Sequence, residues 1–134
     1  MDDRELIRLA HQARERAYAP YSNFLVGAAL ETRNGKVYLG CNIENASYGA
    51  SNCAERTAFF KAVSEGERDF AKIAIVGGPR GEEACPACAP CGICRQVMSE
   101  FCDHNTFQIL LEGEDGGIKQ FALDELLPFA FEKI

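Results

Sequence analysis

Three cysteines and one glutamate in this sequence have the types and spacing of a metal-dependent hydrolytic site. Cys53 and Glu55 are separated by one residue, and Cys91 and Cys94 lie in a Pro-Cys-Gly-Ile-Cys segment further along the chain. Three thiolates can bind one zinc ion and leave its fourth position open for water, as in catalytic zinc sites. A carboxylate beside the first ligand can move protons to and from that water. The pattern therefore predicts a catalytic zinc site.

The same cysteines are also compatible with a closed metal site that has no catalytic role. A structural zinc site needs four ligands, and Cys85 and Cys88 extend the run to four regularly spaced cysteines. The run resembles a bacterial iron–sulfur motif, but that motif has a longer final gap and a proline after its last cysteine, whereas Arg95 follows Cys94 here. Glu55 alone could simply complement a helix dipole. The presence of Cys53 beside Glu55 favours the catalytic interpretation.

Both cysteine segments are predicted to lie where a helix begins. Residues 53–65 and 91–101 have helical composition. The N–H groups of a first helical turn have no intrahelical partner, and the helix dipole is positive at that end. Both effects favour thiolate over thiol, as metal binding requires. Three thiolates with Zn²⁺ still leave a net negative charge, and Arg56 is the expected donor that stabilises a thiolate sulfur.

The rest of the sequence predicts a sheet that carries these two helices. Further helices are expected at residues 3–18 and 123–127, and strands at 24–30, 36–41, 71–76, 106–111 and 118–121. Asn34-Gly35 is a strong turn signal between the first two strands. In the first helix, apolar residues recur at helical spacing and charges fill the other positions. We therefore expect one α/β domain, residues 1–134, with a mixed five-stranded sheet covered on both faces.

Composition and charge restrict the partners of this chain. Its 134 residues are 47% hydrophobic and carry a net charge of −6, which disfavours binding to a nucleic acid polymer. No apolar run approaches the roughly 18 residues of a membrane span, and the charged start, Met1–Glu5, lacks a signal peptide's apolar region. We expect a cytoplasmic protein that acts on a small molecule. Its seven cysteines are expected to be reduced and available for metal.

Several segments, in sequence order, resemble the homotetrameric zinc-dependent cytidine deaminases of the cytidine/deoxycytidylate deaminase superfamily. They are PYSNF (20–24), VGAAL (26–30), NIENA (42–46), CAERTA (53–58) and PCGICRQ (90–96), with LLP (126–128) and Phe131 near the end. The match runs nearly end to end and is far more specific than a lone Cys-x-x-Cys motif. It implies a three-layer α-β-α sandwich and one Zn²⁺ per chain, bound by Cys53, Cys91 and Cys94.

The resemblance also implies a reaction. Cytidine and 2′-deoxycytidine would be hydrolysed to uridine and 2′-deoxyuridine plus ammonia, as a step in pyrimidine salvage. Glu55 would take a proton from zinc-activated water, deliver it to N3 of the cytosine, and protonate the amine that leaves after attack at C4. One carboxylate can serve first as the base and then as the acid.

The substrate contacts implied by the resemblance lie in four segments. Asn42 and Glu44 match residues that hydrogen-bond the ribose, and two positions apart on an extended segment they project the same way; a loop-capping role is the alternative. Phe24 would pack against the nucleoside, while Ala46, Tyr48 and Phe131 would reach across subunits of a homotetramer with shared active sites. The full expected set is Phe24, Asn42, Glu44, Ala46, Tyr48, Ala54 and Phe131.

Alternatives remain for two cysteines and for the function. Cys85 and Cys88 are not required by the family pattern. Cys88 could compete with Cys91 or Cys94 for zinc, or the pair could form a labile disulfide, bind a second metal or have no function. Related deaminases act on antibiotics or modified nucleosides, but the ribose-reading segment 42–44 argues against them. A polynucleotide deaminase would need a basic groove, and a non-enzymatic zinc module would not need Glu55.

Overall fold

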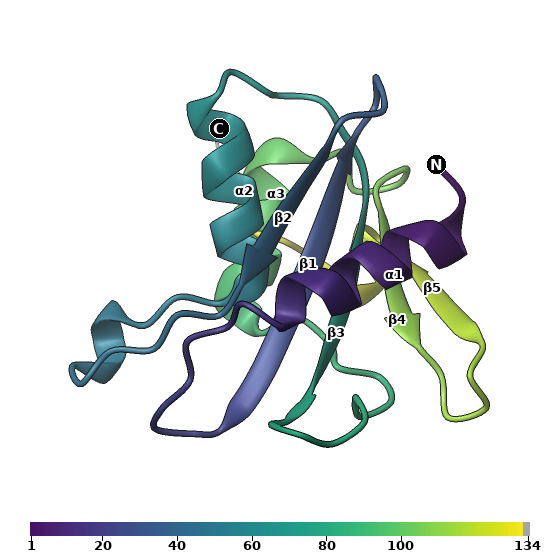
Figure 1. The fold of residues 1–134 in the computed structure, drawn as a ribbon. Helices are drawn as coiled ribbons and strands as arrows, with labels where there is room; N and C mark the ends of the chain where they lie inside the picture. Colours follow the sequence, from purple (N-terminus) through teal and green to yellow (C-terminus); the bar gives the residue numbers. More distant parts are fainter. Residues whose placement is uncertain (133–134) are drawn as a thin grey trace.

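A computed structural model describes residues 1–132, which are built around a mixed five-stranded sheet (Figure 1). The strands are β1 (Phe24–Thr32), β2 (Val37–Cys41), β3 (Phe70–Pro79), β4 (Gln108–Glu112) and β5 (Ile118–Ala122), in the spatial order β2-β1-β3-β4-β5. Only the neighbours β3 and β4 are parallel among these described strands. Parallel neighbours need a crossover connection, and the chain between them supplies it with a helix.

Helices cover both faces of this sheet, as the sequence predicted. They are α1 (Asp3–Arg14), α2 (Ala54–Ser64), α3 (Gly92–Phe101) and the short α4 (Leu123–Leu126), with a 3₁₀ turn, η1 (Tyr48–Ala50). Figure 1 shows α1 crossing one face of the sheet, with α2 and α3 on the other. The segment that contains η1 projects beyond the edge of the sheet. Within residues 1–132, every helix is too short or too polar to cross a membrane.

Two hydrophobic clusters hold the three layers together. Leu6 of α1 packs on one face of the sheet with Ala29, and Phe59 of α2 packs on the other face with Leu30. Successive residues of a strand point to opposite faces, so Ala29 and Leu30 of the same strand serve different clusters. All four side chains are fully buried.

Two elements differ most in length from the sequence prediction. The first helix ends at Arg14 rather than near residue 18, because the Tyr18 N–H donates to the Asn42 carbonyl and the chain there forms a bridge beside Ile43. β3 extends to Pro79 because it pairs with β1 along the whole length of that strand. In both cases a contact distant in sequence, and not local periodicity, sets the boundary.

Gly40 on β2 allows α2 to lie directly against the sheet. A Cβ at this position would lie 2.3 Å from the carbonyl oxygen of Ala54 and 2.6 Å from the backbone nitrogen of Ala58. Backbone atoms cannot rotate away as the end of a side chain can. Any larger residue would therefore displace the helix whose first turn follows Cys53.

We expect Gly40→Ala to lower the free energy of unfolding by about 1–3 kcal/mol, as overpacking of a tight contact does. Chemical denaturation with a fluorescence or circular dichroism readout would measure it. Gly49→Ala is the matched control, since nothing lies within 4 Å of the added Cβ there. Equal stability of Gly40→Ala and wild type would contradict this account of how α2 is seated.

Candidate metal centre and active-site cleft

The sulfur atoms of Cys53, Cys91 and Cys94 lie together at the N-termini of two helices. Cys53 is the N-cap of α2, Cys91 is the N-cap of α3, and Cys94 lies in the first turn of α3. Cys91 Sγ is 3.8 Å from Cys53 Sγ and 3.5 Å from Cys94 Sγ, and all three sulfurs lie within 4.8 Å of one another. Sulfur ligands at zinc's bond length of 2.3 Å in a tetrahedral site are about 3.8 Å apart. The cluster therefore fits a zinc ion.

The protonation of this cluster suits metal binding. Hydrogen bonds from Cys94 and then from Arg56 lower the pKa of Cys53 to about 5, against the opposing effect of burial. The pKa of Cys94 is raised, because its thiol is hydrogen-bonded to Cys53 and is buried. The thiolate form of Cys53 is therefore favoured before a metal binds. Metal binding would release the proton that Cys94 holds.

Arg56 lies where the sequence analysis expected a thiolate-stabilising cation. Its Nη2 donates to Cys53 Sγ at 3.2 Å. Its Nε is buried and has no hydrogen-bond partner among the described residues. A guanidinium in this place offsets the negative charge that three thiolates bring together.

Glu55 is buried in the same part of the structure. It is the second residue of α2 and only 4% exposed. Burial, followed by the charge of Cys53, raises the pKa of Glu55 to about 7, against hydrogen bonding from its own backbone N–H. A carboxyl group with a pKa near neutrality can accept a proton and return it under the same conditions.

A cleft of about 410 Å³ opens beside the sulfur atoms. Phe24, Asn42, Glu44, Tyr48 and Ala54, all expected from the sequence to contact substrate, line this cleft. Other residues that line it are Val26, Ser51, Asn52, Cys53, Glu55, Arg56, Cys88, Ala89 and Cys91. The cleft therefore joins the metal-binding and the expected substrate-binding residues.

Two expected substrate residues lie outside the cleft of their own chain. Ala46 is exposed in the segment before η1. The Phe131 side chain is 82% exposed. The Phe131 carbonyl oxygen accepts a hydrogen bond at 2.9 Å from Nε2 of Gln96, a residue of α3. Neither residue lines the cleft beside the sulfurs.

Asn42 and Glu44 are already hydrogen-bonded within the chain. Asn42 Oδ1 accepts from the Val26 N–H at 2.8 Å, and its Nδ2 donates to the Phe24 carbonyl at 2.9 Å. Glu44 accepts from the hydroxyl and the backbone N–H of Ser22, and the hydroxyl contact is the main cause of its lowered pKa. Asn42 and Glu44 therefore do have the loop-capping role. The same hydrogen bonds hold their polar groups rigidly at the cleft.

Cys85 and Cys88 do not join the sulfur cluster. Cys88 lines the cleft and packs against β3, where a Cβ on Gly77 would lie 2.6 Å from its Sγ. Burial raises the pKa of Cys88 to about 11, which favours the thiol. Cys85 is exposed, and both are free thiols. Among residues 1–132, only Cys53, Cys91 and Cys94 form a group that could hold a metal ion, so the four-cysteine run does not close on itself.

Sequence reasoning did not predict several residues of the cleft as site residues. Val26, Ser51, Asn52 and Ala89 line it, and most of them come from irregular segments. Irregular segments have no periodicity that indicates where a side chain points. Their positions follow from how the loops before α2 and α3 pack, which is a tertiary property.

The fold and the site define a class: an α/β protein with a zinc centre of the catalytic type. The sequence matches the family model of the cytidine and deoxycytidylate deaminase zinc-binding region over residues 1–109. The chain belongs to this family.

Similar proteins support the assignment. The chain is 53% identical over 131 residues to the cytidine deaminase of Halalkalibacterium halodurans, covering 98% of this chain and 95% of that protein. It is 49% identical over 133 residues to the cytidine deaminase of Sporosarcina psychrophila, covering 99% and 93%. The crystal structure of cytidine deaminase from Burkholderia pseudomallei matches with a TM-score of 0.87 at 52% identity, covering 98% of this chain and 100% of that chain.

We expect purified protein to contain one zinc ion per chain, and replacement of any cluster cysteine to remove it. Cys53→Ser, Cys91→Ser and Cys94→Ser each delete a sulfur from the group that fits zinc. Cys85→Ser and Cys88→Ser are the controls and should keep zinc, because their sulfurs lie outside that group. Metal analysis by mass spectrometry after dialysis against a chelator would measure this. Zinc retained by Cys91→Ser but lost from Cys88→Ser would assign the ligand role to Cys88 instead.

Proposed function

We propose that this protein is a zinc-dependent cytidine deaminase. It hydrolyses cytidine and 2′-deoxycytidine to uridine and 2′-deoxyuridine and releases ammonia, and residues 1–134 act as one catalytic domain. The observation that carries the proposal is the placement of a buried carboxyl group beside a three-sulfur cluster in one cleft. The chain is also about half identical to named cytidine deaminases over nearly its whole length.

The proposed catalytic roles follow from position and charge. Cys53, Cys91 and Cys94 would hold the zinc ion, which would supply Lewis-acid activation of water near neutral pH. Glu55 would accept a proton from the attacking water and donate it to N3 of the base. It would then take the remaining proton from the hydroxyl group newly bonded to C4 and pass it to the amine, which leaves as ammonia. Arg56 donates to Cys53 and stabilises its thiolate form.

Substrate recognition in this proposal depends on polar groups that are already fixed. Asn42 and Glu44 bind the sugar hydroxyl groups, and their bonds to β1 and Ser22 hold them in place before substrate arrives. Phe24 and Ala54 pack around the nucleoside, and so does Tyr48, which was expected to reach across an interface but lines the cleft of its own chain. A carboxylate at the sugar end disfavours a phosphate group there, so the proposed substrate is a nucleoside and not a nucleotide.

We also propose a homotetramer whose active sites are completed by neighbouring subunits. Phe129 and Phe131 are among the most exposed apolar side chains, and Phe60 is 47% exposed. Surplus exposed apolar surface is typical of an interface. Phe59, the neighbour of Phe60 on α2, is instead fully buried in the core. Ala46 and Phe131 lie away from their own cleft and are available to a neighbouring one. The activity belongs, in this proposal, to cytoplasmic pyrimidine salvage.

Purified protein is expected to convert cytidine to uridine, observed as a change in ultraviolet absorbance, while Glu55→Gln is not. The amide cannot accept the proton from water, so kcat should fall by at least about 10²–10⁴-fold. Zinc content and fold should be retained. Glu65→Gln, exposed at the end of the same helix, is the control and should keep full activity. Conversion by Glu55→Gln at the wild-type rate would refute the assigned role.

Light scattering after size exclusion should give a mass about four times the chain mass of 14.7 kDa. Phe131→Ala should raise KM in that assembly with little effect on zinc content, because the side chain contributes to a cleft other than its own. Phe60→Ala is the comparison for assembly: Phe60 is also exposed but does not line the cleft, so a rise in KM in this variant should occur only with a loss of tetramer mass. A fully active monomer would contradict the shared-site proposal.

A further inference from the structure

Arg14 is a buried cation that lies outside the residues of the active-site cleft. It is the last residue of α1 and only 7% exposed. Its Nε donates to the Leu25 carbonyl at 3.1 Å, and its Nη2 donates to the carbonyls of Pro79 and Glu82 at 2.9 and 3.2 Å. No ion pair of residues 1–132 includes it. A buried charge without an ion-pair partner is costly. The contribution of Arg14 to the structure is therefore its hydrogen bonds to three backbone carbonyls.

The first of these bonds reaches a strand that forms part of the active-site cleft. Leu25 lies between Phe24 and Val26 on β1, and both of these neighbours line the cleft. Arg14 therefore holds, from the α1 side of the sheet, the backbone whose alternate side chains face the substrate site.

The other two bonds reach Pro79, the last residue of β3, and Glu82, in the connection between β3 and α3, residues 80–91. The turn at its start is closed by the Glu82 N–H and Pro79 carbonyl at 3.1 Å. Further along, the Ala87 N–H donates to the Glu112 carbonyl at 2.8 Å. The connection then supplies Cys88 and Ala89 to the cleft. Most of its residues are exposed, and the Cys85 N–H, which donates to the Gly77 carbonyl at 2.6 Å, ties its middle to β3.

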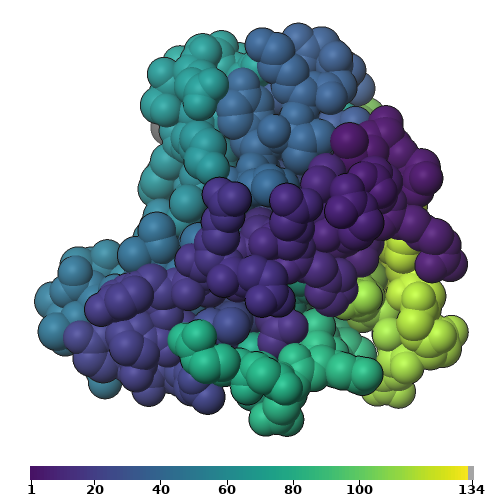
Figure 2. All heavy atoms as spheres, viewed as in Figure 1, coloured from purple at the N-terminus to yellow at the C-terminus, as the bar shows by residue number. Residues whose placement is uncertain are grey.

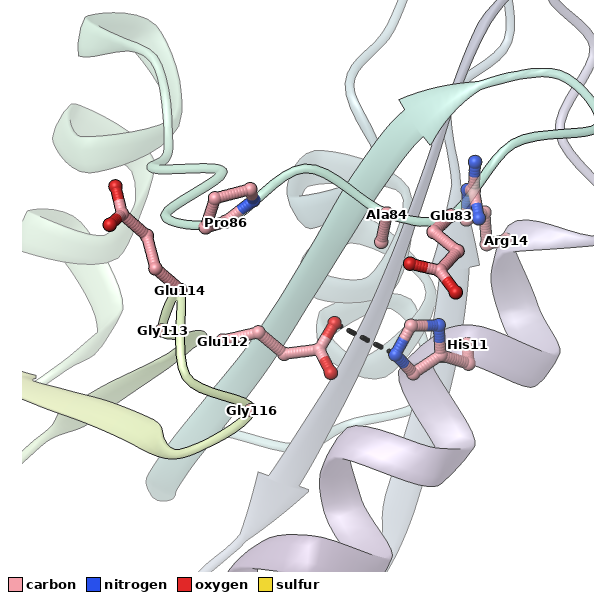
Figure 3. A pocket seen from close by; sticks show the side chains of 9 residues that line it. All are labelled: His11, Arg14, Glu83, Ala84, Pro86, Glu112, Gly113, Glu114 and Gly116. Atoms are coloured by element: carbon pink, nitrogen blue, oxygen red, sulfur yellow. Dashed lines mark ion pairs between the residues drawn. The ribbon is translucent and has the colours of Figure 1, made fainter.

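Arg14 also lines an acidic cleft that is separate from the active-site cleft. This second cleft, of about 500 Å³, is lined by Arg14 together with Glu83, Glu112 and Glu114. Figure 2 shows the hollow beneath α1, and Figure 3 shows Arg14 beside Glu83, with His11 paired to Glu112 at 2.8 Å. The guanidinium thus shares this cleft with three carboxylates while its N–H groups remain bonded to backbone carbonyls.

We infer that Arg14 is a positioning residue: it holds β1 and the 80–91 connection at the separation that the nucleobase requires. This role rests on the proposed deaminase function for its substrate readout. An arginine suits it because the guanidinium has five donors in a planar fork, whereas a lysine ammonium is a point charge. Gly78 keeps the space open, since a Cβ there would lie 3.0 Å from Arg14 Nη2 and 2.8 Å from the Glu83 carbonyl.

The test compares Arg14→Lys with Arg4→Lys, an exposed position on the same helix. Arg14→Lys keeps the charge but cannot bridge three carbonyls, so we expect KM to rise about tenfold, the effect of losing one charge-assisted hydrogen bond. kcat should change less than KM, and zinc content should stay at the wild-type level. In a Glu55→Gln background the Kd for cytidine, measured by calorimetry, should weaken in parallel. Amide hydrogen exchange of residues 80–90 should accelerate.

Several outcomes would overturn the inference. A lower melting temperature with KM, Kd and loop exchange unchanged would make Arg14 structural only. Should Arg14→Lys fail to fold, Gly78→Ala decides, because it keeps the guanidinium but displaces the connection; an unchanged KM and unchanged exchange would then refute the role. If wild-type protein does not convert cytidine, the proposed function fails, and the exchange of residues 80–90 still tests the anchor.

Discussion

The rest of the structure depends on one electrostatic constraint. Several groups that become negative on ionisation are gathered in one place, and this costs free energy. Cys53, Cys91 and Cys94 share one small volume, and Glu55 is buried beside them. Two helix N-termini and the Arg56 guanidinium supply the compensating positive potential. With less compensation the thiols would stay protonated and could not bind metal.

The scaffold places those two N-termini side by side. α2 and α3 both pack on one face of the sheet, and Gly40 allows α2 to approach β2 more closely than any other residue would. The parallel pairing of β3 with β4 requires a crossover. That crossover contains Cys91 and Cys94 and places them beside Cys53. β1 and the start of the crossover are joined through Arg14, so fold stability and cleft geometry depend on some of the same contacts.

The parts of the site that sequence could predict are those with local signatures. The cysteine spacings, the helix starts and the mixed α/β order are readable because each depends on near neighbours in the chain. Arg14 is one of the charged residues of the first helix, which the periodic pattern predicts to lie outside the apolar stripe, yet it is buried. Its spacing of four from Ala10 and seven from Ile7 places it on that stripe, which was the available signal. The capping bonds of Asn42 and the end of α1 depend on partners distant in sequence.

The sequence by itself determined which residues can bind zinc, where two helices begin, and that a carboxyl group follows the first ligand. Only the tertiary structure decided which cysteines meet. Cys88 is far closer in sequence to Cys91 than Cys53 is, yet Cys53 Sγ lies 3.8 Å from Cys91 Sγ, and Cys88 lies outside the group. The reason is physical: the extended N-caps of two packed helices converge on one point, while the connection before α3 turns Cys88 toward β3. The raised pKa of Glu55 likewise comes from burial, which spacing along the chain does not specify.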